Sequence, residues 1–414
     1  MTPLALGLDL CFFRVISGME IHNNDHEHEH VILHLQSLTK SYDSLIREFL
    51  NPEFAKDLGH FDRVLKTCCM MIEIIRNNPR ISLDKTLFQL QEAHVFATTN
   101  DVKVQCHMKS MVFSMILWVS HIAVPSPCSS LSSFKIQNQG AKYPTLSSVA
   151  MDRSQRPLDV MLRGFGESLP WCKHGREQGA IPFGGEAKRF QVASLNADAL
   201  RQVAKMQFVW VDSLSAHLDL DPNVPALYLF KAPTFCKLQS TGDSFLSLFA
   251  TTLCTEDENS AQEFSVPRLM EEIILSYSLL FKDDRRARVL YRKSERQRAV
   301  VIDSRGFPHY DPCLEEACGG SLSTALLAWN QPIRETYHAD SDFPNLSDRL
   351  ERLQIFMDGI QTNRIVSLWR DRRDRRLWFT FWVVIIFGVV GIIQGFLGNI
   401  LAAVQIYFSQ LGGR

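Results

Sequence analysis

The sequence predicts a mainly α-helical protein with a small β element and one C-terminal transmembrane helix. Leu377 to Gly413 contains no charged residue, and an apolar run of more than about 18 residues is typical of a membrane-spanning helix. Apolar side chains recur at helical spacing through much of the preceding chain. Large apolar residues alternate along Met206 to Val211, and Ala226 to Phe230 is a second short apolar run, so we expect two strands there.

The composition is that of a globular protein with a membrane segment. The 414 residues allow two or three domains, and a formal net charge of −1 gives no general attraction to nucleic acid. The ten cysteines are scattered without the spacing of a disulfide framework. In a chain that faces the cytosol we therefore expect reduced, mostly buried thiols.

The first third of the chain divides into an N-terminal tail, residues 1–24, and a helical region, residues 25–124. The tail lacks the basic start of a secretory signal, and charged residues interrupt its apolar run. Within the helical region, Ser82 is a candidate N-cap. The uncharged run Ser110 to Val124 is too short to cross a bilayer, so we expect a buried core helix there.

A change in composition separates this region from a second unit. Residues 125–189 are rich in serine, proline and glycine, which predicts a flexible linker. Residues 190–363 are predicted to form a mainly helical domain with the small β element. Its expected helices are Asn196 to Ala204, Leu269 to Phe281, and Leu346 to Leu368, the last leading straight into the anchor.

Residues 377–411 are predicted to be the transmembrane helix, with the span near residues 379–400 and an interfacial tail at 401–411. The 14 Leu, Ile, Phe and Val residues between Leu377 and Leu397 favour insertion by roughly 4–8 kcal/mol. The alternative is a re-entrant hairpin at Gly395 to Asn399, but each of its arms is too short to cross. Three aromatic residues are placed to mark the membrane interfaces: Trp378, Trp382 and Tyr407.

Arginines flank this helix on one side. The basic juxtamembrane segment, residues 364–376, contains six arginines, and only Arg414 lies beyond the span. Five of the six lie next to the helix: Arg370, Arg372, Arg373, Arg375 and Arg376. Because arginine-rich flanks stay cytosolic, we expect the N-terminal bulk in the cytosol, in a membrane that the sequence does not specify. The arginines either mark topology alone or also bind anionic lipid.

A stripe of small residues runs along the predicted span. Gly388, Gly391, Gly395, Gly398 and Ala402 repeat at spacings of three and four, which places them on one helix face. Small residues let two helix backbones approach closely in lipid. The stripe predicts pairing between copies of the chain, although glycine is also common in membrane helices generally.

Several short segments together form a recognisable set. They are Leu162 to Gly166, Ser194 to Ala197, Val209 to Leu214, Pro233 to Cys236, Ile274 to Phe281, Leu368 to Arg373 and Trp378 to Trp382. Over roughly residues 160–410 the chain resembles a large family of uncharacterised filamentous-fungal proteins with a C-terminal membrane anchor. The resemblance implies a membrane-anchored protein without an established activity, so no catalytic residue or cofactor carries over. The chain departs from the family at Lys282 to Asp284, where a glycine-containing turn is expected.

Metal-binding residue types cluster near the N-terminus. On a helix His22, His26, His30 and His34 would share one face, and neutral imidazoles at that spacing can bind zinc, nickel or copper. A solvated polar segment is the simpler interpretation, because no matching cysteine or second helix completes a site. His309 to Cys318 and Trp171 to His174 also lack a second ligand pair.

Motifs for catalysis or nucleotide binding are weak. Gly164 to Gly166 starts like a dinucleotide-binding loop but lacks the third glycine of that motif, so it predicts a turn. No complete phosphate-loop, nucleophile-elbow or zinc-protease motif occurs in the sequence. Asp212, Ser213 and His217 are residue types of a catalytic triad, but sequence proximity does not position a base. Asp212 is more simply the N-cap of a short helix. Lys282 to Arg298 carries eight basic residues, typical of a solvated helix end or a contact with anionic membrane or an acidic partner.

These patterns favour a single-pass, tail-anchored membrane protein over an enzyme. The expected partners are the lipid bilayer, a second copy of the chain and an unidentified cytosolic protein; no cofactor or nucleic acid is expected. The cytosolic part would act as an interaction or scaffold module. The alternative is a membrane-bound enzyme whose site is assembled from distant residues such as His217, His309 and Cys313.

Overall fold

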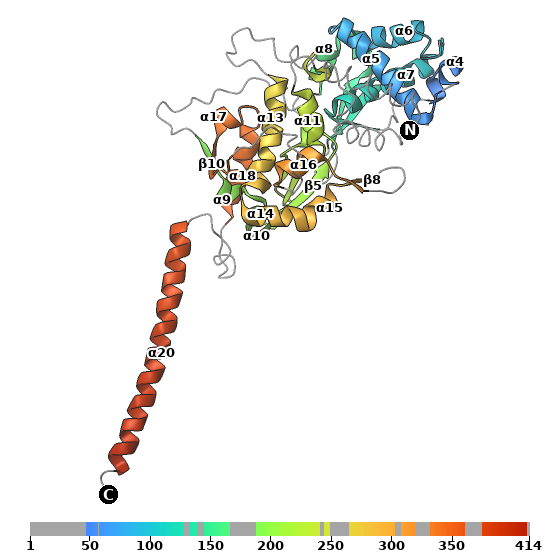
Figure 1. Ribbon diagram of the computed structural model, residues 1–414. Coiled ribbons are helices and arrows are strands. Elements are labelled where there is room, and N and C mark those ends of the chain that lie inside the picture. Colours follow the sequence, from blue (N-terminus) through green and yellow to red (C-terminus); the bar gives the residue numbers. More distant parts are fainter. Residues whose placement is uncertain are drawn as a thin grey trace, which may run out of the picture.

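The computed structural model describes residues 47–56, 58–126, 132–138, 145–165, 188–240, 244–248, 265–302, 308–319, 332–360 and 375–411. The described residues up to 360 form a head, and helix α20 (Arg375–Leu411) extends away from it (Figure 1). Within the described ranges the fold is mainly helical, with four small sheets of short strands. The predicted fold class is confirmed.

The N-terminal part of the head is helical, as predicted. After the short α4 (Pro52–Ala55) come α5 (His60–Asn77), α6 (Leu83–Glu92) and α7 (Val102–Ser120). Ser82 is the N-cap of α6, because its side chain accepts a hydrogen bond from the backbone N–H of Lys85. The predicted core helix is confirmed, since α7 is buried from Ser110 to its end.

The expected linker, residues 125–189, is largely ordered structure where it is described. β2 (Ser133–Asn138) pairs antiparallel with β3 (Thr145–Ala150), and β1 (Val124–Pro125) lies at the edge. A 3-10 turn (Met151–Gln155) and α8 (Leu158–Arg163) follow. Residues 166–187, which contain the second half of the predicted linker, lie outside the described residues.

The linker prediction failed because composition concealed a short amphipathic strand. Phe134 and Ile136 point into the core of the head, and the Phe113 ring lies 5.0 Å from that of Phe134. Lys135 and Gln137 alternate with them on the other face. The burial of Phe134 and Ile136 therefore stabilises a segment whose serines and prolines are typical of a loop.

The second part of the head contains the predicted β element. β5 (Gln207–Val211) pairs parallel with β7 (Ala226–Phe230), and β6 (Leu220–Asp221) pairs antiparallel with β7. α10 (Ala197–Val203) precedes the sheet, capped by the side chain of Asn196. Both predicted strands and this predicted helix are confirmed.

Helices pack around that sheet. α11 (Pro233–Gln239) and α16 (Pro312–Ala317) contact α13 (Val266–Tyr277), which continues through a π-helical turn (Ser278–Lys282) to α14 (Arg285–Leu290). A second π-helical turn and two further strand pairs complete the head. Its remaining elements are β4 (Arg189–Gln191), α9 (Val192–Leu195), a 3-10 turn (Leu214–Ala216), the π turn Tyr291–Glu295, α15 (Arg296–Arg298), β8 (Val301–Ile302), β9 (Pro308–His309), β10 (Thr336–His338), α17 (Ala339–Asp342) and α18 (Ser347–Gly359).

One cluster of buried apolar side chains extends from Leu50 to Met357. It includes residues of α5, α6 and α7 as well as residues of β5, β7 and α13. The two parts of the head therefore share a hydrophobic core, and removing either would expose apolar surface of the other.

The last helix of the head ends before the anchor. The predicted helix Leu346 to Leu368 is observed as α18, which stops at Gly359, and Ile360 is extended (φ −78°, ψ 107°). Glycine is a poor helix former, which favours an end at this point. Because α18 ends at Gly359, the expectation of one helix from Leu346 to Leu368 that leads straight into the anchor is wrong at Ile360. Residues 361–374 lie outside the described residues.

A buried carboxylate joins α13 to the start of α18. Glu272 is 1% exposed, and its Oε2 accepts hydrogen bonds from the backbone N–H groups of Asn345 (2.8 Å) and Leu346 (2.9 Å). Its Oε1 accepts from the Asn345 side-chain amide at 2.7 Å. Burial raises the pKa of Glu272 from 4.5 to about 7, against the opposing effect of these bonds.

We expect Glu272→Gln to flatten the pH dependence of stability. Because the folded-state pKa is raised, the contribution of Glu272 to stability is full below about pH 4.5 and is lost as pH rises through about 7. Glutamine can keep the backbone bonds without a charge. Relative to the variant, the wild type should lose about 3 kcal/mol of unfolding free energy between these limits. Unfolding curves from pH 4 to 8 check this; parallel profiles would contradict it.

Candidate functional site

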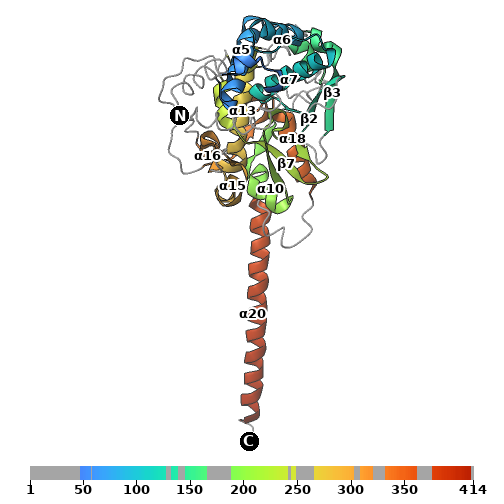
Figure 2. The ribbon, with the colours of Figure 1, turned by 90° about the vertical axis from the view of Figure 1, so that its right-hand side faces the viewer.

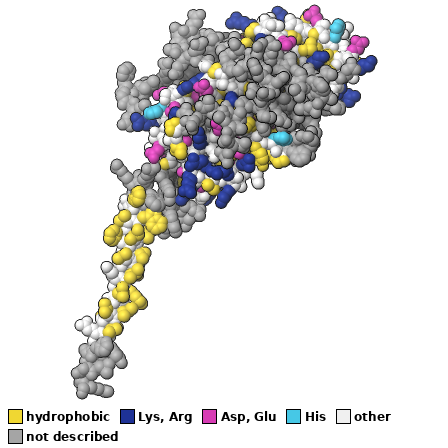
Figure 3. All heavy atoms as spheres, in the orientation of Figure 1, with side chains coloured by type: hydrophobic (Ala, Val, Ile, Leu, Met, Phe, Trp, Pro, Cys, Tyr) yellow, Lys and Arg dark blue, Asp and Glu magenta, His cyan; other side chains and the backbone are white. Residues whose placement is uncertain are grey.

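The most exposed apolar surface of the described residues is helix α20. Its segment Trp382–Ile406 is 25 residues long, apolar enough to cross a membrane, and unburied. At 1.5 Å per residue it spans about 37 Å, which exceeds a hydrocarbon core of about 30 Å. Phe387 is 72% exposed and Ile392 is 74% exposed, and Figure 3 shows apolar side chains along the helix. Such a surface requires lipid or another protein around it.

The structure refines the predicted span. α20 is continuous through Gly395 to Asn399, so the hairpin alternative is not observed. Trp382 is half-buried at the start of the candidate span. Trp378 and Tyr407 lie within the same helix, but their side chains are not among those described. The candidate span ends six residues beyond the predicted 379–400 range.

The predicted small-residue stripe is open. An added Cβ at Gly388, Gly391, Gly395 or Gly398 would meet no atom within 4 Å. No described atom therefore covers the glycines of this face within 4 Å. Pairing between copies remains a prediction.

Two other predicted sites fall mostly outside the described residues. His22, His26, His30 and His34 lie there, so the metal site remains a prediction. Among the described residues no group of three or more His, Cys, Asp and Glu side chains is placed to hold a metal ion. Of the juxtamembrane arginines, Arg370, Arg372 and Arg373 lie outside, whereas Arg375 and Arg376 begin α20 with side chains that are not described.

Two of the three residues proposed for an enzyme site, His217 and Cys313, are engaged in the core. His217 is fully buried, its Nδ1 accepts the backbone N–H of Phe230 at 3.2 Å, and its Nε2 lies 2.9 Å from Ser276 Oγ. Burial, with a smaller effect of Arg349, lowers the pKa of His217 from 6.5 to about 3. Cys313 is also fully buried, while His309 lies in β9. Neither His217 nor Cys313 can be reached by a substrate in solvent.

Asp212, Ser213 and His217 do not form a triad. The Asp212 carboxylate pairs with Lys231 at 2.8 Å, and its backbone carbonyl lies 3.3 Å from His121 Nδ1. Ser213 Oγ donates to the carbonyl of Ile122 at 3.0 Å. The predicted N-cap role of Asp212 is wrong: Ser213 precedes the 3-10 turn, without a side-chain cap bond. The ion pair with Lys231 therefore accounts for the orientation of the Asp212 carboxylate.

The described cysteines are free thiols, as expected. They are Cys68, Cys69, Cys106, Cys236, Cys313 and Cys318. All except Cys106 are buried. Burial raises the pKa of Cys68 to about 12, and it also raises that of Cys236 and Cys318. These thiols are therefore protonated and unreactive at neutral pH.

Apart from a bend at Asp283 and Asp284, the basic segment Lys282 to Arg298 is helical, and part of it forms a charged surface. Five exposed residues, which we call the basic face, are Arg285, Arg286, Arg292, Lys293 and Arg298. In Figure 1, α10, α14 and α15 lie at the lower end of the head, toward α20, and Figure 2 shows α10 and α15 at the same end. Figure 3 shows Lys and Arg side chains gathered there. The basic face thus lies near the start of α20.

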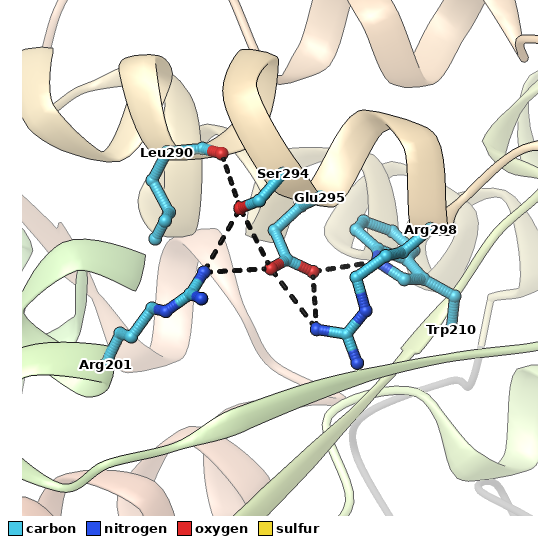
Figure 4. A network of polar contacts seen from close by, with 6 residues as sticks. All are labelled: Arg201, Trp210, Leu290, Ser294, Glu295 and Arg298. Carbon is cyan, nitrogen blue, oxygen red and sulfur yellow. Dashed lines mark hydrogen bonds and ion pairs between the residues drawn. The ribbon is translucent and has the colours of Figure 1, made fainter.

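A buried glutamate holds two arginines at this end of the head (Figure 4). The Glu295 side chain is fully buried, and Arg201 Nη1 donates to its Oε1 at 3.2 Å. Arg298 Nη1 contacts both carboxylate oxygens at 3.3 Å. Trp210 Nε1 donates to Oε2 at 3.3 Å, and Ser294 Oγ lies 3.3 Å from Oε1. One carboxylate therefore fixes two guanidinium groups from different parts of the chain.

An open cavity of about 310 Å³ lies beside this network. The residues that line it come from α10, the connection to β5, β5 itself, the end of the π turn and α15: Arg201, Gln202, Lys205, Met206, Gln207, Phe208, Glu295 and Arg298. Three cationic side chains and one carboxylate give the lining two positive charges in excess. Sequence reasoning missed Arg201 and Lys205, because they are far in sequence from the basic segment that they join.

Comparisons with known proteins add no further constraint: no family model, curated protein or solved structure matches this chain. The resemblance to fungal membrane-anchored proteins therefore stays a prediction from the quoted sequence segments.

Proposed function

We propose that this chain is a single-pass membrane protein whose head lies in the cytosol and acts as a membrane-anchored interaction or scaffold module. The observation that carries the proposal is α20, whose apolar side chains are exposed along the whole candidate span. The resemblance to fungal proteins with a C-terminal anchor belongs to the same proposal. The proposal applies to any membrane with a cytosolic face.

The distribution of charge supports the cytosolic placement of the head. Six arginines precede the span, and one lies beyond it, which is the asymmetry of a cytosolic flank. The basic face lies at the end of the head nearest to α20. An anionic cytosolic leaflet attracts such residues by about 1 kcal/mol each near the surface. The lipid bilayer is thus the first partner that we propose.

The interior of the head supports an interaction module over the alternative of a membrane-bound enzyme. His217 and Cys313 are fully buried, and both ring nitrogens of His217 have hydrogen-bond partners inside the core. A general base must reach the proton that it removes from a substrate. Such a role would require the core to open around His217.

Alkaline carbonate extraction tests the anchored state. Vesicles that contain the full-length chain are washed with carbonate, which removes peripheral proteins but not inserted helices. We expect the chain to remain in the pellet with the lipid. A protein held on the membrane by its basic face alone would be released under these conditions. Complete release of the chain into the supernatant would therefore contradict the proposal.

We also predict that the glycine stripe pairs two copies of α20. Gly391→Leu combined with Gly395→Leu places two large side chains where backbones would approach, so association in lipid should weaken roughly tenfold, about 1.4 kcal/mol. Energy transfer between labelled copies, measured at increasing dilution in lipid, checks the change. Val389→Leu with Ile393→Leu enlarges or reshapes the opposite face and serves as the control. Equal behaviour of the two double variants would refute pairing through the stripe.

A further inference from the structure

We propose that the cavity beside Glu295 binds a phosphorylated group, carried either by a lipid headgroup or by a small soluble compound, for both of which inositol phosphates serve as probes. This inference goes beyond the anchored module and does not require α20 to cross a membrane, because a soluble ligand can test it. The chemistry comes from Arg201, Lys205 and Arg298, which line the cavity.

The two arginines present donors in a fixed arrangement. Both contact Glu295 through Nη1 (Figure 4), and their Nη2 and Nε groups take no part in those contacts. The Arg201 and Arg298 side chains are 43% and 50% exposed, whereas that of Glu295 is fully buried. Glu295 therefore holds them from the inner side while their outer edges face solvent. A planar guanidinium offers parallel N–H donors that match the oxygens of a phosphate.

The buried network also lowers the cost of binding. Glu295 is held by Trp210 and Ser294 in addition to the two arginines, so the guanidinium groups are ordered before a ligand arrives. Immobilising a long side chain otherwise opposes association. Two excess positive charges favour a multiply charged anion over a neutral one. A volume of about 310 Å³ is at the lower end of ligand pockets, which suits one small phosphorylated group.

Lys205 adds the third cation at a position that is unfavourable for lysine. It follows the end of α10 with a positive φ of 57°, a conformation that glycine adopts at lower cost. Its Nζ donates only to the carbonyl of Gln202 at 3.1 Å among the contacts of this side chain in the described residues. A lysine at this site costs stability, which a role in binding an anion would explain.

The location of the cavity provides a source for such a ligand. α10 and α15 lie at the end of the head nearest to α20 in both views, and Figure 1 shows α14 beside them (Figures 1 and 2). The basic face lies on α14, the following π turn and α15, and Arg298 belongs to both the face and the cavity lining. A phosphorylated lipid headgroup in the same membrane would therefore lie on the side where the cationic groups are exposed.

Calorimetric titration of the full-length chain in neutral detergent with inositol trisphosphate tests the proposal. We expect saturable binding that weakens roughly tenfold in Lys205→Gly, while the melting temperature of this variant stays equal or rises because the backbone strain is relieved. Arg298→Gln should also weaken binding. Lys103→Gln removes an exposed charge on α7, far along the head, and should leave the affinity unchanged. Absence of binding to the wild type, or equal affinities of all variants, would overturn the proposal.

A second arm distinguishes the two sources of the phosphate group. The full-length chain is placed in phosphatidylcholine discs with or without phosphatidylinositol bisphosphate, and inositol trisphosphate is titrated again. Competition by the lipid supports a headgroup ligand; its absence, with binding to the soluble compound, supports a soluble one. Preferential binding of an acidic peptide over inositol trisphosphate, with the same sensitivity to Lys205→Gly, would overturn the assignment to phosphate.

Discussion

Two arginines at the middle of α20 are expected to prevent its insertion. Ile393→Arg and Leu397→Arg each replace a favourable contribution with a cost of about 2.5–3.5 kcal/mol near the helix centre. Together they oppose insertion by roughly 6–8 kcal/mol, which is comparable to the roughly 4–8 kcal/mol by which the apolar residues favour it. The double variant should move from the pellet to the supernatant in alkaline carbonate extraction.

The position of the charge provides the control for this experiment. Gln405→Arg introduces a charge near the end of the candidate span Trp382–Ile406, where a long arginine side chain can reach the interface. This variant should stay in the pellet. Retention of the Ile393→Arg and Leu397→Arg double variant would show that something other than an apolar span holds the chain.

Of the single substitutions proposed for the head, Asp311→Ala is expected to lower the unfolding free energy most. The carboxylate caps α16 by accepting the backbone N–H of Leu314 at 2.9 Å. It also accepts both the N–H (3.1 Å) and the Oγ1 hydroxyl (2.8 Å) of Thr234 at the start of α11. One side chain therefore joins the N-termini of two helices. Alanine would leave three donors unpaired, and a loss of about 3–5 kcal/mol in unfolding free energy follows.

Denaturant unfolding of the full-length chain at pH 8 measures this loss. Burial raises the pKa of Asp311 from 3.8 to about 6, so the carboxylate is ionised at that pH. Asp101→Ala is the matched control, because Asp101 is an exposed N-cap that accepts only the N–H of Lys103 at 2.8 Å among its side-chain contacts in the described residues. It should cost about 1 kcal/mol. Equal losses in the two variants would contradict the double capping role of Asp311.

The features that sequence predicted correctly are local ones. The span depends on one uncharged stretch, Leu377 to Gly413. The predicted cap Ser82 acts on Lys85, three positions away, and β5 follows from alternation within a few residues. Each of these signals is complete within one short segment, so tertiary contacts are not needed to interpret it.

The features that sequence missed depend on distant contacts. β2 contains only two inward apolar residues, Phe134 and Ile136, in a segment rich in serine and proline, and packing against α7 decides its structure. Glu295 looks like one acid in a basic segment, yet Arg201 is 94 residues away in sequence and Trp210 is 85. Burial likewise decides that His217 is part of the core, which residue type alone could not show.

Protease protection of intact vesicles, with one tag at each end of the full-length chain, tests the central claim most directly. If α20 crosses the bilayer with the head in the cytosol, added protease should destroy the N-terminal tag and the head while a short C-terminal fragment stays protected until detergent is added. Protection of the N-terminal tag would contradict the orientation, and digestion of both tags without detergent would contradict the crossing itself.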